Sequence, residues 1–219
     1  MAPRCVFDDL VGQPRVATFL AAAARSGAVS HAYLFVGPGG SGKKSAAKAL
    51  ACAVLCDDGG CGSCPVCQRI RKGFHPDVHV ISPEGAATYM VEQVREIIHD
   101  VSLTPVEGSS KVYILDAAEA MGHQVANALL KTLEEPPADV LIVLLATDFD
   151  SVLPTIASRC QVVRFQRIPP STAIAMLTQR AGVGEEEARA ALAAASGVLP
   201  RALDFLRSSG RRAMRDEAL

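Results

Sequence analysis

Hydrophobic and polar positions alternate between two patterns over the first two thirds of the chain. Short, nearly continuous apolar runs are followed by segments in which apolar residues recur every three or four positions. The apolar runs predict strands at residues 31–37, 77–82, 111–118, 139–147 and 161–166. Runs of this kind are typical of strands that helices cover on both faces. Regular strand–helix alternation therefore predicts an α/β fold with right-handed βαβ units and a mostly parallel five-stranded sheet.

Helical spacing fills the gaps between these strands. Helices are predicted at residues 44–56, 91–103 and 123–135. The last of them must stop at Pro136-Pro137, because proline lacks the N–H that a helix needs and clashes with the preceding turn.

The pattern changes near residue 167. The pattern there predicts three short helices separated by glycine or proline, at residues 169–183, 184–198 and 200–209. We therefore expect an α/β domain at 1–166 and a small helical domain at 167–219.

Composition narrows the class of protein. The 219 residues are 49% hydrophobic and 21% charged, with a net charge of -1, which is typical of a soluble globular protein. There is no overall basic excess, so any contact with DNA must come from a local patch or from partners. No apolar run reaches the ~18 residues of a membrane span, and the first residues lack the apolar core of a secretory signal. We expect a cytoplasmic protein that contacts no membrane.

A glycine-rich loop follows the first predicted strand. Gly37, Gly42 and Lys43 match the P-loop pattern G-x-x-x-x-G-K-[ST], and the loop opens a predicted helix, as a phosphate-binding loop must. The next residue is Lys44, where a P-loop has the hydroxyl that binds Mg²⁺. Ser45 is a poor substitute for that hydroxyl. One residue further along a helix is rotated about 100° around the axis, so its side chain should point elsewhere.

Polar residues end the third and fourth predicted strands. Asp116 follows an apolar strand, as the acidic residue of a Walker B element does, but it also fits a simple strand-end cap. ATPases of this type usually have Glu next, where this chain has Ala117, and we expect Glu119 to face elsewhere. Thr147 would point toward the phosphate end of the loop or bond nearby backbone. Lys44 and Ala117 together predict a chain that does not hydrolyse ATP, while weak nucleotide binding stays open.

Four of the seven cysteines lie within twelve residues. Cys56, Cys61, Cys64 and Cys67 could surround one Zn²⁺ tetrahedrally and close the site to substrate. Disulfides are the alternative, but clustered cysteines in a reducing compartment favour metal binding. Cys52 is a competing ligand that we expect to pack on its helix instead.

Two arginines complete the candidate residues. Arg159, in the sequence Ser-Arg-Cys before the fifth strand, suits bidentate contact with phosphate, although a lone surface arginine is usually an ion pair. Arg201 begins a helix of the second domain, and it too could simply form a surface ion pair.

Together these segments resemble the bacterial DNA polymerase III clamp-loader subunits, which are AAA+ proteins of the gamma/tau and delta-prime types. The resemblance covers almost the whole chain and rests on FDDLVGQ (7–13), HAYLFVGPGGSGK (31–43), the four-cysteine insert, KVYILD (111–116), NALLKTLEEPP (127–137) and TIASRC (155–160). It implies an AAA+ P-loop domain followed by a helical lid, with a Cys₄ zinc module inserted at about 56–67.

The resemblance also implies a role. Gamma/tau subunits hydrolyse ATP with a Thr after the P-loop Lys and Asp-Glu in Walker B, so Lys44 and Ala117 favour the delta-prime type, a component that is not itself an ATPase. Arg159 would then act in trans on the ATP site of a gamma/tau neighbour. Thr147 and Arg201 fall near the family's sensor positions. A gamma/tau-like ATPase is the alternative, and a free-standing zinc-stabilised DNA-binding module is a weaker one.

Partners follow from the same resemblance. They would be the gamma/tau and delta subunits, with the sliding clamp and primer-template DNA reached through the complex. The chain departs from the family in two ways: the spacing from Cys56 to Cys61 is shorter than usual, and the helical collar domain expected after residue 219 is absent.

Overall fold

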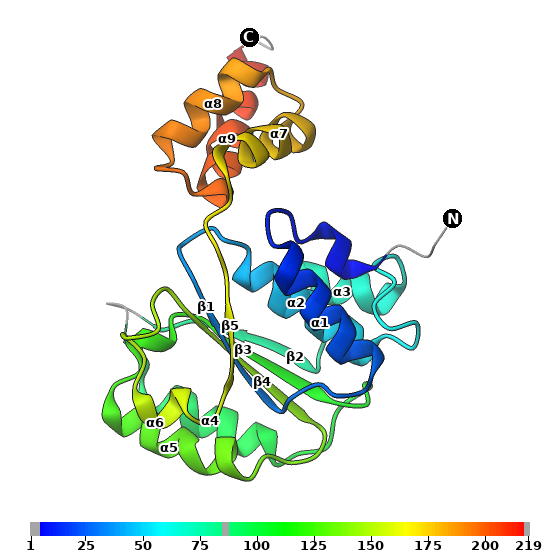
Figure 1. Cartoon of the computed structure of the whole chain (residues 1–219), viewed down its shortest axis with the longest axis vertical. Coiled ribbons are helices and arrows are strands. Elements are labelled where there is room, and N and C mark those ends of the chain that lie inside the picture. Colours follow the sequence, from blue (N-terminus) through cyan, green and yellow to red (C-terminus); the bar gives the residue numbers. More distant parts are fainter. Residues whose placement is uncertain (1–4, 85–87, 217–219) are drawn as a thin grey trace. The chain divides into compact units, whose positions relative to one another are not determined.

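A parallel sheet of five strands organises the first part of the chain (Figure 1). The computed structural model describes residues 5–84 and 88–216. The strands are β1 (Ala32–Val36), β2 (Val78–Ile81), β3 (Lys111–Leu115), β4 (Val140–Ala146) and β5 (Gln161–Arg164). Their order across the sheet is β2-β3-β4-β1-β5, and every neighbouring pair is parallel. The predicted α/β class is confirmed, since all five strands lie within the expected ranges.

Helices cover both faces of this sheet, as Figure 1 shows. One face carries α1 (Pro14–Arg25), α2 (Lys43–Leu55) and α3 (Pro65–Lys72), and the other carries α4 (Val91–Val101), α5 (His123–Glu134) and α6 (Pro154–Ala157). Successive strand side chains point to opposite faces. Tyr33 and Phe35 of β1 therefore belong to one apolar cluster, and Leu34 belongs to the other.

Two short 3₁₀ turns complete this part: η1 (Val6–Asp9) and η2 (Ala118–Ala120). The apolar pattern did not assign η1, η2, α1, α3 or α6. Helix α5 ends at Glu134, two residues before the proline pair that was predicted to stop it.

The chain divides into two compact units. The first contains residues 1–37 and 42–165, and the second contains the loop tip 38–41 with residues 166–219. The second unit is helical, with α7 (Pro170–Ala181), α8 (Glu185–Ala194) and α9 (Leu199–Asp216). Its buried side chains include Leu177, Ala188, Leu192 and Leu206.

Gly40, in the loop tip, has a φ of +75°, and a Cβ there would lie 3.0 Å from Cγ1 of Val198. A larger residue at that position would be strained and crowded. In the part of the chain that the structure describes, no helix has the length and apolar character needed to cross a membrane.

Candidate functional site

The carboxyl ends of three neighbouring strands bring the glycine loop and two polar residues to one edge of the sheet. Strands β3, β4 and β1 are adjacent and parallel, so Asp116, Thr147 and Gly37, which follow them, meet at that edge. This edge of an open α/β sheet is where ligands usually bind. The structure thus brings Asp116 and Thr147 to the end of the sheet where the glycine loop begins.

Gly37 and Gly42 occupy positions where a side chain would not fit or would strain the backbone. Gly37 donates its N–H to the carbonyl of Ala146 at 3.1 Å, and a Cβ on Gly37 would lie 2.5 Å from the carbonyl oxygen of Phe165. Gly42 has a φ of +94° immediately before α2. Close packing and a left-handed turn therefore require glycine at these two positions.

Lys43 begins α2 and turns its ammonium back toward the loop. The ammonium donates to the carbonyl of Gly37. Burial lowers the pKa of Lys43, while the negative charges of Glu119 and Asp116 oppose that effect. Lys43 is thus held at the loop by its own chain, close to two carboxylates.

Lys44 pairs with Asp116 across the site. Its Nζ lies 3.1 Å from Oδ2 of Asp116, and both side chains are partly exposed. The other carboxylate oxygen of Asp116 accepts the N–H of Ala117 at 3.1 Å. Both oxygens of the acid that a Walker B element would offer to a metal are therefore already engaged.

Glu119 lies at the site, and the expectation that it would face elsewhere is wrong. Ala117 adopts a left-handed conformation with φ +52°, and the 3₁₀ turn η2 follows directly. This turn brings Oε1 of Glu119 to 2.6 Å from the hydroxyl of Thr147, which donates to it. Oε2 of Glu119 is buried and has no hydrogen-bond partner among the described residues. Spacing along a strand could not reveal this position, because the backbone leaves the strand at Ala117.

Tyr89 is a further contact that sequence reasoning missed. Its buried hydroxyl lies 2.6 Å from the carbonyl oxygen of Asp116 and 3.1 Å from that of Ile81, and it donates toward both. Burial, followed by the charges of Asp116 and Glu119, raises the pKa of Tyr89. The neutral phenol thus fixes the backbone at Asp116. A lone tyrosine outside any motif gave no signal of this role.

Arg159 lies near the amino-terminal ends of the strands, opposite the end that carries the glycine loop. Gln161 pairs with Tyr33 at the start of β1, and Arg159 precedes it by two residues. The carbonyl of Leu133, at the end of α5, lies 3.2 Å from Nε2 of His31 just before β1. At 3.3 Å per residue the length of β1 separates this end from the loop by about 15 Å. The guanidinium contacts Glu134 there, its Nε donating to Oε1 at 2.7 Å.

Arg201 belongs to the second unit. It is exposed in the first turn of α9.

The four predicted cysteines converge into one cluster. The sulfur atoms of Cys56, Cys61, Cys64 and Cys67 all lie within 4.8 Å of one another. The sulfur of Cys56 lies 3.8 Å from that of Cys61 and 3.6 Å from that of Cys64. Tetrahedral zinc with bonds of about 2.3 Å needs sulfurs about 3.8 Å apart. The cluster could therefore bind a metal ion of this kind.

Backbone N–H groups support the cluster. The amide of Cys64 donates to the sulfur of Cys61 at 3.4 Å, and the amide of Cys67 donates to that of Cys64 at 3.4 Å. Donation from Ser63, and then from Cys64, lowers the pKa of Cys61 to about 6. Such donors favour the thiolate that a metal requires.

Cys52 lies outside the cluster, as expected. It is buried on α2, and its thiol faces the carbonyl of Cys67 at 3.8 Å. Burial, the largest effect, raises the pKa of Cys52 to about 11. A group that is buried and held neutral in this way packs as an apolar side chain.

The cysteine segment packs on the start of the chain. The amide of Val6 in η1 donates to the carbonyl of Gly60 at 3.0 Å, and a Cβ on Gly60 would lie 2.7 Å from Cγ2 of Val6. Arg71 of α3 forms an ion pair with Asp9 of η1. The cysteine cluster therefore anchors η1 as well as α3.

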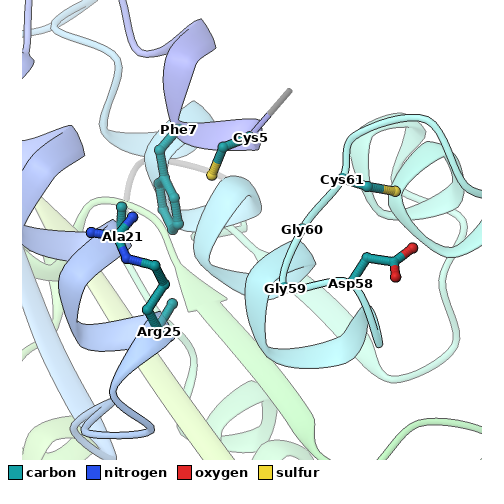
Figure 2. A pocket seen from close by; sticks show the side chains of 9 residues that line it. Cys5, Phe7, Ala21, Arg25, Asp58, Gly59, Gly60 and Cys61 are labelled. Carbon is teal, nitrogen blue, oxygen red and sulfur yellow. The ribbon is translucent and has the colours of Figure 1, made fainter. Parts of the chain in front are cut away.

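A hollow of about 620 Å³ lies between η1, α1 and the loop before Cys61 (Figure 2). In Figure 2 the sulfur of Cys61 points away from Cys5, which lies beside Phe7. Cys5 is likewise absent from the group of residues that could hold a metal. The hollow therefore lies on the outer side of the cysteine loop, and among the described residues Cys5 is not part of the metal-binding group.

Comparison with known proteins places this geometry in a family. The family described as "DNA polymerase III, delta subunit" matches residues 12–169. The delta' subunit of Bacillus subtilis DNA polymerase III is 41% identical over 161 residues, which is 72% of this chain and 49% of that protein. The tau subunit of the same organism is also 41% identical, over 74% of this chain and 29% of that protein. The chain thus spans about half the length of the delta' relative, and identity alone does not separate the two types.

A solved structure supports the fold. The Thermotoga maritima RuvB Holliday junction branch migration motor aligns with a TM-score of 0.63 at 18% identity, covering 91% of this chain and 62% of that one. At this identity the likeness shows the AAA+ fold alone. Taken with the family match, it leads to one conclusion: the chain belongs to the DNA polymerase III delta subunit family of clamp-loader proteins.

Proposed function

We propose that the chain is the delta-prime-type subunit of a DNA polymerase III clamp loader, one that does not hydrolyse ATP and that gives Arg159 to the ATP site of a gamma/tau neighbour. The observation that carries this proposal is the ion pair between Lys44 and Asp116, at 3.1 Å.

The pair explains why hydrolysis would fail. P-loop ATPases hold Mg²⁺ between the hydroxyl after the P-loop Lys and the Walker B Asp. Lys44 has no oxygen to donate to a metal, and its ammonium already neutralises the acid. A cation fixed beside Asp116 also repels a second cation. Ala117 adds no carboxylate to polarise water.

The position of Arg159 supports a role in trans. It lies at the far end of the sheet from its own glycine loop, about 15 Å away by the length of β1. An arginine there cannot reach a phosphate bound at Lys43. Its side chain is 33% exposed, so a neighbouring subunit's nucleotide could approach it.

The other parts follow from family membership. Zinc in the cysteine cluster would be structural, since four thiolates leave no open position. The delta subunit, the sliding clamp and primer-template DNA are proposed as partners within the complex, and the cytoplasm as its location.

The test is a clamp loader assembled with the full-length subunit and its gamma/tau and delta partners. Arg159→Ala should lower DNA-stimulated ATP hydrolysis at the neighbouring site by about 10³-fold, the cost of losing an arginine finger. Arg95→Ala, at an exposed position on α4, is the matched control and should leave the rate unchanged. An unchanged rate in Arg159→Ala would contradict the role in trans.

A gamma/tau-like ATPase is the second candidate, and the position of Glu119 favours it. The carboxylate accepts a hydrogen bond from Thr147, and one of its oxygens has no partner among the described residues. Its charge also opposes the burial that lowers the pKa of Lys43. It could polarise water in place of the missing Glu at residue 117. ATP turnover by the purified chain with Mg²⁺, lost in both Lys43→Ala and Glu119→Gln, would establish this alternative.

A further inference from the structure

Arg159 is already bound by its own chain on nearly every side. Its Nε donates to Oε1 of Glu134 at 2.7 Å, and its Nη2 contacts the same oxygen. Its Nη1 donates to the carbonyl of Thr155 at 2.8 Å and faces the hydroxyl of Ser158 at 3.4 Å. The guanidinium is therefore held within a surface network of its own subunit.

A count of donors shows what this network leaves over. An arginine has five N–H donors, one on Nε and two on each terminal nitrogen. Four of the five face Glu134, Thr155 or Ser158, so one N–H of Nη2 has no partner in the part of the chain that the structure describes. A phosphate is bound best by two parallel N–H groups. Arg159 cannot offer its Nε/Nη2 edge to a phosphate while Glu134 occupies that edge.

The position of Glu134 makes the contact reversible. Glu134 is the last residue of α5, where the partial negative charge of the helix end disfavours a carboxylate. The guanidinium offsets this repulsion. The Arg159 and Glu134 side chains are 33% and 46% exposed, so water and salt screen the pair. Ion pairs this exposed shift an equilibrium by no more than about fivefold.

From these contacts we propose that Glu134 is a latch that holds Arg159 on its own subunit until a neighbouring subunit's nucleoside triphosphate competes for the guanidinium. The inference rests on the proposed function. Glu134 acts through Arg159 and is a positioning residue. It touches the guanidinium before engagement and gives way to a phosphate group that carries more negative charge.

A latch of this kind has a distinctive kinetic signature. Because the triphosphate carries more negative charge than Glu134, Arg159 leaves the latch in nearly every ATP-bound complex, and the competition weakens only the apparent affinity for ATP. Removing the carboxylate charge should therefore lower KM for ATP and leave kcat unchanged. A residue that only supports local structure, or that orients Arg159 in the transition state, would lower kcat instead.

The experiment measures ATP hydrolysis against ATP concentration in the loader assembled with the full-length subunit. Glu134→Gln should lower KM by about two- to fivefold, with kcat unchanged, because an exposed pair is worth this much. The neighbouring residue supplies the matched control: Glu135 is exposed at the end of α5, and Glu135→Gln should change neither value. Thermal unfolding of each variant checks that the fold is kept.

A second measurement needs no partner. Arg159 in the subunit alone should react faster with phenylglyoxal, an arginine-specific reagent, in Glu134→Gln than in wild type or Glu135→Gln.

The outcomes separate the two proposals. A lower kcat or an unchanged KM in Glu134→Gln, with Arg159→Ala still inactive, overturns the latch and leaves the role of Arg159 in trans intact. Full activity in Arg159→Ala overturns both. Unchanged reactivity toward phenylglyoxal in Glu134→Gln also overturns the latch.

Discussion

The ammonium of Lys44 lies 3.1 Å from the carboxylate of Asp116, so a side chain provides the cation at the place where a P-loop ATPase would bind Mg²⁺. Neither residue is unusual alone. Their contact makes the glycine loop an internally neutralised site, with Lys43 and Lys44 facing Asp116 and Glu119.

Replacing Lys44 should make ATP binding depend on Mg²⁺. Lys44→Thr supplies the missing hydroxyl and frees Asp116, so we expect ATP to bind about tenfold or more tightly in Mg²⁺ than in EDTA. That factor corresponds to one charge-assisted contact. Wild type should bind ATP equally weakly in both conditions. Calorimetric titration checks this, with Ser45→Thr, one residue along α2, as control. A wild-type chain with strong Mg²⁺-dependent binding would contradict our account of the pair.

The cysteine cluster should contain one zinc ion per chain. Cys64→Ser should lose the metal, although serine preserves the hydrogen bond that Cys64 offers as the N-cap of α3. A loss of metal in this variant therefore cannot be attributed to loss of the helix cap. Cys52→Ala, beside the cluster but outside it, should keep the metal. Elemental analysis of the purified variants measures both, and a metal-free folded wild type would disprove the assignment.

Removing the metal should also loosen the start of the chain. The cysteine loop holds η1 through the contact between Val6 and Gly60, and α3 holds it through Arg71 and Asp9. After chelation we expect faster amide exchange in η1 and α3 than in β1 and β4. Uniform exchange across these segments would show that the metal does not order them locally.

Asp77 should be a large contributor to stability. This buried carboxylate accepts N–H bonds from Val106 (2.6 Å), Glu107 (3.0 Å) and Gly108 (2.7 Å). Asp77→Asn puts an amide donor against these donors, and should lower the free energy of unfolding by about 3 kcal/mol at pH 7. Urea unfolding measures it, with the exposed Glu96→Gln as control.

The effect of Asp77 should depend on pH in a defined direction. Burial alone would raise its pKa, but the three backbone donors together lower it below the usual value. A lowered carboxyl pKa stabilises the folded chain above the ordinary pKa near 4, and this stability is lost as the pH falls through the native pKa. The difference between wild type and Asp77→Asn should therefore shrink between pH 6 and pH 3. A constant difference would contradict this.

His75 should make the fold less stable in mild acid. Its ring is buried, with Nδ1 accepting the amide of Asp77 and Nε2 3.2 Å from Glu107. Burial lowers the pKa of His75, against the charge of Glu107. The unfolded chain then takes up a proton near pH 6.5 that the folded chain resists, so stability falls as the pH drops below about 6.5.

Replacing that histidine should flatten the pH dependence. His75→Gln should lose less stability between pH 7.5 and pH 5.5 than wild type does, measured by urea unfolding. His99→Gln, at an exposed position on α4, should behave as wild type. An equal loss in all three proteins would remove His75 as the cause.

The sequence alone predicted the five strands, most of the helices and all four clustered cysteines. Apolar runs and close cysteine spacing are local signals, and both persist into the structure. It missed α1 and α3, although each begins with a proline at its first position, which is a helix-start signal.

Three relationships became visible only in the tertiary structure. Asp116 lies beside Lys44 because β3 and β1 end at the same edge of the sheet, with β4 between them. Glu119 reaches Thr147 because the backbone turns left-handed at Ala117. Arg159 meets Glu134 because the end of α5 packs near the start of β1. The sequence determined which residues were present and which elements carry them. Contacts between residues 25 to 72 positions apart depend on how those elements pack, and only the folded chain decides them.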